Sequence, residues 1–370
     1  MMIRTVGWVA AAISGLICLA VFGILISQPE EKLSPRPEKT DVSDHGCLFL
    51  DTAWLGAVSP CGDGLAAGNS RGEVLFFDHL EKGTKPRIFP LSKYAISAPP
   101  LVREGVCFVG DENGTFWAFR PEKGLLWSFR TGNQITGGAV WCDGSIWVGS
   151  HDQSLYAFDP KEGTVLQTLE CDGQINGSPL FSDSLKAIFV GSCDGFLRKI
   201  DTRTGKRVAE LDFHSPIPQS PVLADGVLYL LTHQGVLAAV DAETFQPRYQ
   251  ITLKGRHFLT SPTIQGDLLL LTDESGKIEV RSARDGSFLA WLPSEEKMTA
   301  PQVVFDDRIY AVSKQGKLFC WQLQNGTWTS QLAADFHSDF AYGCVRMGNR
   351  LILVDENGGL FYYAYLKIGT

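Results

Sequence analysis

Short apolar stretches separated by glycine-centred turns repeat along the chain from about residue 47 to its end. In most units a polar residue precedes the glycine, and a strand of alternating apolar and polar residues follows it. The marks of successive units are Gly72, Gly114, Gln153, Gly195, Gly235, Gly276, Gly316 and Gly359, which lie 39 to 43 residues apart. Eight units at one period indicate a repeat architecture.

Each unit predicts four short strands. The first begins near a small residue and often a proline, as at Ser178-Pro179. The second is a nearly continuous apolar run, such as 106–110, which is typical of a strand buried on both faces. The glycine turn leads to an alternating third strand, and a further turn leads to the fourth. No helical periodicity of useful length follows Ile26.

Four-stranded units of about 40 to 45 residues that stack face to face and close radially form a β-propeller. Residues 47–370 have room for eight such units. The predicted fold is therefore all-β, an eight-bladed β-propeller of four-stranded antiparallel blades. The last unit ends after its third strand, whereas one strand, 47–52, precedes the first unit. We expect this segment to pair with Leu360–Tyr365 as the fourth strand of blade 8 and so to close the ring.

The first 46 residues have a different pattern. Val6–Ile26 contains no charge and is long enough for a helix to cross a bilayer, so we interpret it as a transmembrane signal anchor. Arg4 precedes it and Glu30 follows, which places residues 1–5 in the cytoplasm as a stub and the rest of the chain outside. A polar, proline-containing linker, 27–46, then leads to the propeller. A cleaved signal peptide is the alternative, although no clear small-x-small cleavage site is present.

Several repeats share a longer motif. It runs from a small residue and proline through an apolar strand that ends in glycine, and then to Ala-Phe-Asp and a turn with tryptophan; its fullest copy is AFRPEKGLLW at 118–127. This pattern resembles the pyrroloquinoline-quinone-like (PQQ-like) propeller repeat over residues 47–370. The final tryptophan is kept in only some repeats, Trp127 and Trp291, and its spacing shifts. This loss should weaken the tryptophan contacts between blades without changing the fold.

The PQQ-like superfamily includes quinone-dependent dehydrogenases and non-catalytic scaffolds. The dehydrogenases are generally longer and carry an adjacent Cys-Cys pair and a Glu/Asn/Asp calcium site, which we do not find in this sequence. The sequence is similar to the second, BamB-like group, although it lacks the lipobox of that group. The resemblance implies a non-catalytic protein-binding scaffold of the periplasm, with a role in envelope or outer-membrane protein assembly. The alternative is a quinone-dependent or other small-molecule enzyme, or a ligand sensor, that uses the central channel.

Composition and charge narrow the range of partners. The 370 residues include 33 Lys and Arg against 41 Asp and Glu, a formal net charge of −8, and 44% are hydrophobic. Such a chain is too apolar to be disordered. Its acidity argues against a nucleic acid partner, because proteins that bind nucleic acids usually concentrate basic residues. The expected partners are a protein and, through Val6–Ile26, the membrane.

The cysteines indicate no metal or redox chemistry. None of the nine forms a C-x-x-C pair, which argues against zinc ribbons and thioredoxin-like sites. Cys107 and Cys320 lie within strand patterns, where cysteine behaves as a small apolar residue. Buried free thiols are therefore the expectation, and the sequence leaves open whether any two cysteines pair.

Two other residue sets raise the question of a metal site. Comparable loops between blades contain His214, His257 and His337. Turns of the form Asp-Glu-x-Gly begin at Asp111, Asp273 and Asp355. Loops of separate blades seldom converge within about 2.1 Å of one ion, and the Asp-x-Asp-x-Asp spacing of calcium loops is absent. We therefore expect solvated histidines and turn-forming aspartates, and no catalytic, cofactor-binding or metal-binding residue.

Overall fold

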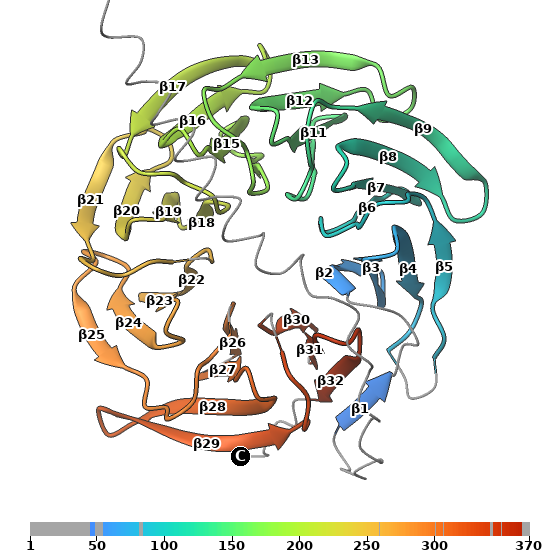
Figure 1. Cartoon of the computed structure of the whole chain (residues 1–370). Coiled ribbons are helices and arrows are strands. Elements are labelled where there is room, and N and C mark those ends of the chain that lie inside the picture. Colours follow the sequence, from blue (N-terminus) through green and yellow to red (C-terminus); the bar gives the residue numbers. More distant parts are fainter. Residues whose placement is uncertain are drawn as a thin grey trace, which may run out of the picture.

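The computed structural model describes residues 45–48, 55–80, 84–258, 260–299, 301–305, 307–340, 343–348 and 350–364. They form an all-β ring of eight four-stranded antiparallel sheets, the blades, around a central axis (Figure 1). The predicted eight-bladed propeller is confirmed. The predicted anchor, Val6–Ile26, lies outside the described residues. Within the described residues, no helix is long and apolar enough to cross a membrane.

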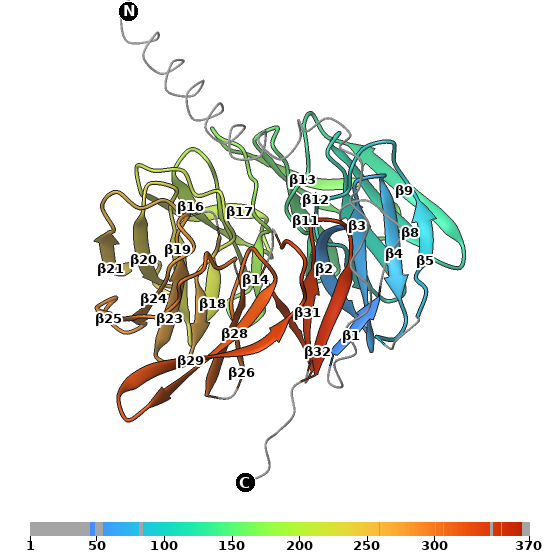
Figure 2. The ribbon, with the colours of Figure 1, turned by 60° about the horizontal axis from the view of Figure 1, so that its bottom comes forward.

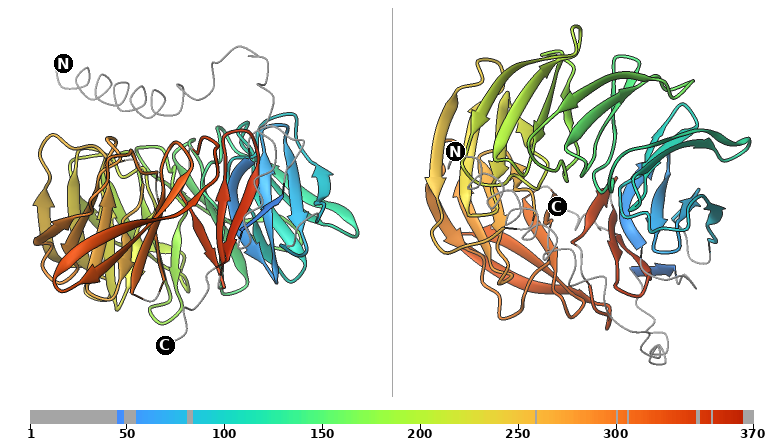
Figure 3. Two further views of the ribbon diagram at one scale, coloured as in Figure 1. Left: turned by 90° about the horizontal axis from the view of Figure 1, so that it is seen from below. Right: turned by 45° about the horizontal axis from the view of Figure 1, so that its top comes forward.

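In the first four blades the strands follow one another along the chain from the axis outward (Figures 1 and 3). Blade 1 contains β2 (Leu55–Cys61), β3 (Gly64–Asn69), β4 (Glu73–Phe77) and β5 (Arg87–Pro90). Blade 2 contains β6 (Leu101–Arg103), β7 (Val106–Gly110), β8 (Thr115–Arg120) and β9 (Gly124–Arg130). Blade 3 contains β10 (Val140–Cys142), β11 (Ser145–Gly149), β12 (Ser154–Phe158) and β13 (Val165–Glu170). Blade 4 contains β14 (Leu180–Ser182), β15 (Ala187–Gly191), β16 (Phe196–Asp201) and β17 (Lys206–Asp212).

The next three blades repeat this order, and the eighth modifies it. Blade 5 contains β18 (Val222–Ala224), β19 (Val227–Leu231), β20 (Val236–Asp241) and β21 (Pro247–Thr252). Blade 6 contains β22 (Thr263–Gln265), β23 (Leu268–Thr272), β24 (Ile278–Ser282) and β25 (Phe288–Trp291). Blade 7 contains β26 (Val303–Phe305), β27 (Arg308–Val312), β28 (Lys317–Gln324) and β29 (Thr327–Asp335). Blade 8 contains β30 (Val345–Met347), β31 (Arg350–Val354), β32 (Leu360–Ala364) and β1 (His45–Leu48).

The outer strand of blade 8 comes from the opposite end of the described chain. β1 pairs antiparallel with β32, from His45 opposite Tyr363 to Leu48 opposite Leu360. This is the place that the sequence predicted for a closing strand. The strand begins two residues earlier than expected, because its pairing register reaches back along β32 to Tyr363. The last residues of the predicted strand, 49–52, lie outside the described residues.

The hydrophobic core is divided into layers between blades. The described residues form eight apolar clusters, one at each interface between neighbouring blades. The second strands β7, β15 and β19 are buried at every residue, as their apolar runs predicted. At the closing interface, Leu55 of blade 1 and Ile352 of blade 8 share one cluster. There the Arg350 guanidinium also donates to the Leu80 carbonyl (2.6 Å).

The connectors between blades explain the glycine at the end of many second strands. The N–H of Ile135 donates to the Asp111 carbonyl of blade 2 (3.1 Å), and the adjacent Gln134 carbonyl accepts from the His151 N–H of blade 3 (2.9 Å). A Cβ on Gly110 would overlap the Ile135 side chain. Glycine therefore lets the connector cross the end of the strand and bind both blades.

The Ser-Pro pairs lie just ahead of the first strands, where they link neighbouring connectors. β14 begins at Leu180. Ser178, two residues earlier, forms hydrogen bonds through both its backbone N–H and its hydroxyl group. The Ser178 Oγ accepts from the Gly138 N–H (2.8 Å), and the Ser178 N–H donates to the Ser220 Oγ (2.8 Å). The Ser261 hydroxyl continues the series by donating to the Ser220 carbonyl (2.8 Å). Small hydroxyl residues therefore join consecutive blades near the axis.

Candidate protein-interaction surface

Exposed apolar side chains lie on the outer strands of several blades. In blades 2, 3, 4 and 6 one of them occupies a β-bulge, where a residue of the outer strand has no partner in the third strand. These residues are Leu126, Leu166, Val208 and Leu289, with 40% to 59% of each exposed. A bulge twists an edge strand and interrupts its free hydrogen-bonding groups. These four edges are therefore poor templates for an added strand.

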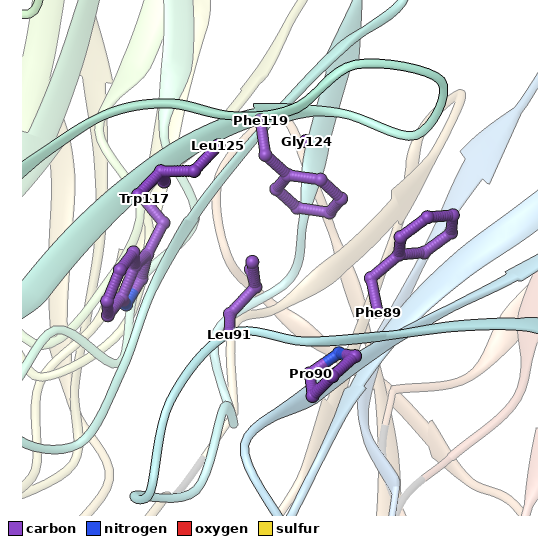
Figure 4. A pocket seen from close by; sticks show the side chains of 7 residues that line it. All are labelled: Phe89, Pro90, Leu91, Trp117, Phe119, Gly124 and Leu125. Carbon is purple, nitrogen blue, oxygen red and sulfur yellow. The ribbon is translucent and has the colours of Figure 1, made fainter.

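A groove of about 200 Å³ lies between the outer strand of blade 1 and the outer strands of blade 2 (Figure 4). Phe89 and Leu91 line it from blade 1 and the connector, and Trp117 and Phe119 line it from β8. Leu125 at the start of β9 completes it and is 54% exposed. None of the lining residues is charged. A concave apolar site of this kind suits an apolar side chain of a partner.

One of the predicted turn aspartates positions this groove. Asp111 is buried, and its Oδ1 accepts from the N–H groups of Asn113 (3.0 Å) and Thr115 (2.8 Å), which shapes the turn before β8. Its Oδ2 accepts from the Ser92 hydroxyl (2.7 Å) and the Trp117 Nε1–H (3.1 Å). The carboxylate therefore ties the connector between blades 1 and 2 to the indole and fixes the orientation of the ring.

Asp273 and Asp355 shape the corresponding turns of blades 6 and 8. The N–H of Ser275 donates to the Asp273 Oδ1 and that of Asn357 to the Asp355 Oδ1, both at 3.0 Å. The Arg256 guanidinium also donates to Asp273 (2.9 Å). Burial raises the pKa of Asp273, but the hydrogen bonds from Ser275 and Arg256 outweigh it and hold the pKa below its usual value. The three aspartates lie in separate blades, and each accepts hydrogen bonds within its own turn.

The three predicted loop histidines also lie apart. His214 and His337 each contact, through Nδ1, the aspartate two residues earlier, at 2.8 and 3.1 Å. His257 lies beside His233 of blade 5, with ring centroids 5.3 Å apart. In the parts of the chain that the structure describes, no group of three or more His, Cys, Asp or Glu residues is arranged to hold a metal ion.

A buried histidine near the axis was missed by sequence reasoning. His151 of blade 3 is 7% exposed, and its Nε2 lies 2.8 Å from the Thr136 Oγ1. Burial lowers the pKa of His151 to about 4, so the ring is neutral at pH 7. Thr136 lies 15 residues earlier, on the connector. The connector between blades 2 and 3 brings these two side chains together, and no local sequence signal shows the contact.

The strand cysteines behave as small apolar residues. Cys107 in β7 and Cys320 in β28 are free thiols, and each is buried within an apolar cluster between blades. Burial raises the pKa of both thiols. Neither is therefore a thiolate nucleophile at neutral pH.

The family of the chain follows from comparison with known proteins. A family profile described as "Outer membrane protein assembly factor BamB" matches residues 123–208 and 184–364, which include most of the propeller. The chain belongs to the BamB family. The resemblance to PQQ-like, BamB-like propellers is thereby confirmed.

Relatives in this family are distant in sequence. The outer membrane protein assembly factor BamB of Salmonella typhimurium is 21% identical, over 68% of this chain and 81% of the relative. Its counterpart in Escherichia coli K12 is 19% identical, over 71% of this chain and 83% of the relative. Both relatives match most of their own length, and the likeness covers about two thirds of this chain.

Solved structures share the same architecture. BamB from Moraxella catarrhalis has a TM-score of 0.72 at 18% identity, covering 90% of this chain and 98% of that chain. The computationally designed protein Ika8 has a TM-score of 0.72 at 14% identity, covering 87% and 99%. A designed protein shares the fold as closely as a BamB does. The structural likeness therefore shows the fold and leaves the function to other observations.

Proposed function

We propose that this chain is a non-catalytic protein-binding scaffold that takes part in outer-membrane protein assembly. Membership of the BamB family supports this role. The observation that carries the binding role is the uncharged groove between blades 1 and 2, built on a rigid ring. Apolar anchor residues that enter such pockets contribute most of the free energy of many protein interfaces.

The groove offers apolar and aromatic surface to a partner. The Trp117 N–H already donates to Asp111, so the indole contributes apolar ring surface and no free donor. Phe89 closes the opposite side, and the exposed Leu125 extends the apolar surface at the rim. The occupant that fits is an aromatic or branched aliphatic side chain on an exposed loop or strand of the partner.

The proposal places the propeller in the periplasm, attached to the cell membrane by a single pass through Val6–Ile26. The uncharged span and the preceding Arg4 support this topology. Protease added to intact spheroplasts is expected to digest the propeller. Protection of the propeller from the protease would contradict the topology.

The proposal also excludes catalysis at the ring axis. Serine hydroxyls there are engaged between connectors, as at Ser178 and Ser220, which supports a structural use of these side chains. The protein purified from its native membrane is expected to contain no stoichiometric quinone, calcium or zinc. One equivalent of any of these, found by mass spectrometry or elemental analysis, would favour the enzyme alternative.

The binding role is tested by photo-crosslinking in cells that express the full chain. A photoreactive phenylalanine analogue in place of Leu125 is expected to crosslink a defined envelope protein. The same analogue at Thr168, exposed on the outer strand of blade 3, is the matched control. Leu125→Glu should lower the level of assembled outer-membrane proteins, because a carboxylate at the apolar rim is costly to desolvate. Crosslinking at Leu125 no stronger than at Thr168 would contradict the proposed groove.

A further inference from the structure

The outer edge of blade 7 is longer than that of any other blade in the described chain. β28 and β29 contain eight and nine residues, whereas the third and fourth strands of the other blades contain four to seven. Asn325 and Gly326 join them, both with positive φ (50° and 79°), as a two-residue hairpin turn requires. Figure 2 shows this hairpin as a long ribbon that extends past the rest of blade 7.

The bulge in this edge lies at the opposite end of the strand. In blades 2 to 6 the unpaired residue is the second or third of the outer strand, and at most four strand residues follow it. In blade 7 the unpaired residue is Ala333, the seventh of β29. Thr327–Leu332 is therefore a six-residue edge without interruption.

This edge also carries no charge. The outer strands of blades 1 to 5 include Arg87, Arg130, Glu170, Arg207 and Arg248, and that of blade 6 ends two residues before Pro293. Charges, prolines and bulges are the features that keep natural edge strands from pairing with other chains. Thr327–Leu332 has none of them. Leu332 is 54% exposed on this edge, and Trp328 is half-buried.

We propose that this edge pairs antiparallel, over Trp328–Leu332, with the same segment of a second copy of this chain, which forms a two-fold symmetric dimer. Centred on Ser330, the pairing places Trp328 of one copy opposite Leu332 of the other, and this contact occurs twice. Side chains alternate along a strand, so these two residues and Ser330 share one face of the joined sheet. Aromatic–aliphatic cross-strand pairs of this kind stabilise a sheet.

The charge of the molecule makes this edge the least unfavourable place for a second copy. The net charge of −8 makes two copies repel each other over most of their surface. The repulsion is least where both contacting strands are uncharged. A charged side chain of a partner strand finds no opposite charge on this segment, whereas a strand with Trp and Leu two positions to either side of its centre fits it. Thr327–Leu332 itself has that spacing, and a two-fold interface needs only one self-complementary patch.

The test is a thiol crosslink at the proposed symmetry centre. Ser330→Cys is introduced into the full chain, and native membranes are treated with a mild oxidant. The two introduced thiols meet across the two-fold axis, so a disulfide-linked species of twice the monomer mass is expected on a non-reducing gel. Its yield should exceed that of the matched variant Thr168→Cys, on the edge of blade 3, by about tenfold, a factor that corresponds to about 1.4 kcal/mol. Wild type measures the background from native cysteines.

A second substitution separates strand pairing from chance collision. Leu332→Lys, added to Ser330→Cys, places a charge on the edge and should reduce the dimer yield to that of Thr168→Cys. Leu166→Lys, at an equally exposed leucine of blade 3, should leave the yield unchanged. All of these positions are exposed on the surface, so the fold is retained. A yield at Ser330→Cys equal to that at Thr168→Cys would overturn the proposal, and so would a product that mass spectrometry shows to contain a different protein.

Discussion

The outer strands of blades 2 and 6 each contain a tryptophan, but the two indoles have opposite roles. Trp127 in blade 2 is 9% exposed, and its Nε1–H donates to the Pro160 carbonyl of blade 3 (3.0 Å). It packs so closely on Gly163 that a Cβ there would overlap the ring. Trp291 in blade 6 is 45% exposed, and its ring lies 4.8 Å from the Arg256 guanidinium. One tryptophan joins two blades, and the other is a surface residue.

A single step of register explains the difference. Trp127 pairs with Ala118 of the third strand, and the equivalent residue in blade 6 is Ala290, which pairs with Val280. Trp291 is one residue further along. Side chains alternate between the faces of a strand, so a shift of one residue turns the indole away from the next blade.

Other side chains occupy the same position in the blades between them. In blade 3, Gln167 donates to the Gly205 carbonyl of blade 4. In blade 5, the Tyr249 hydroxyl donates to the Ala283 carbonyl of blade 6 (3.2 Å). In blades 2, 3 and 5 the side chain at this position reaches a carbonyl of the next blade, and tryptophan is one of three residue types that do so, whereas blade 4 has Ala209 there.

The largest expected effect is a difference in stability between the two tryptophan truncations. Trp127→Ala should lower the free energy of unfolding by about 4 kcal/mol, because it leaves a cavity between blades 2 and 3. Trp291→Ala should lower it by less than about 1 kcal/mol, because the ring is exposed. Urea unfolding of both variants measures the difference. Equal losses would contradict the assignment of one indole to the interior and one to the surface.

The outer strand of blade 8 differs from the outer strands of the other blades, because no hairpin joins β1 to the neighbouring strand β32. A chain that begins at residue 49 loses β1, whereas one that begins at residue 45 keeps it. The shorter chain should be less stable by about 3 kcal/mol, from lost strand hydrogen bonds and buried apolar surface. Thermal melts of the two chains provide the test. The same melting temperature for both would show that the ring closes without β1.

The stability of the propeller should depend on pH through His151. Its pKa is about 4 in the folded chain and near 6.5 when unfolded, so the unfolded chain binds the proton more readily. Stability is therefore retained above about pH 6.5 and lost as the pH falls toward 4, by at most about 3 kcal/mol. Urea unfolding at these two pH values should show a smaller loss in His151→Gln than in wild type. The same loss in both would mean that other groups cause the pH dependence.

The smallest expected effect is the difference in stability between two glycine substitutions. It separates the cost of backbone strain from the cost of losing the indole contact. Gly163 and Gly124 both have positive φ, 72° and 83°. Gly124→Ala should cost about 1 kcal/mol from the backbone conformation alone, since no atom lies near the added Cβ. Gly163→Ala should cost about 2 kcal/mol, because the added methyl group also displaces Trp127. If both variants lose the same stability, the indole is not held against the turn of blade 3.

The repeat made much of this architecture predictable. The period of the glycine turns set the number of blades, and apolar runs such as 106–110 identified the strands buried on both faces. The odd strand count at the two ends of the repeat indicated a closing strand near residue 47. The limits of that strand were missed by two residues, because they depend on pairing with β32, which is distant in sequence.

The candidate surface was much less predictable. Phe89 and Trp117 of the groove belong to different blades, and nothing in either segment shows that they face each other. The spacing of Trp291 appeared irregular in the sequence, but its consequence depended on the bulge at Leu289 and on the register of β25. A bulge has no sequence signal of its own here, since different residue types, such as Leu166 and Arg248, occupy it.

The sequence by itself determined the repeat, the four strands of each blade and the apolar layers between blades, because these follow from short-range periodicity. It also determined that Thr327–Leu332 carries no charge, whereas the position of the bulge beyond this segment depends on strand register. The tertiary structure decided which side chains of neighbouring blades meet. Those contacts join residues about 15 to 40 positions apart, such as His151 with Thr136 or Trp127 with Pro160, and a shift of one residue exchanges interior and surface. Periodicity sets how many blades the chain forms, whereas strand register sets what each blade presents to its neighbours and to a partner.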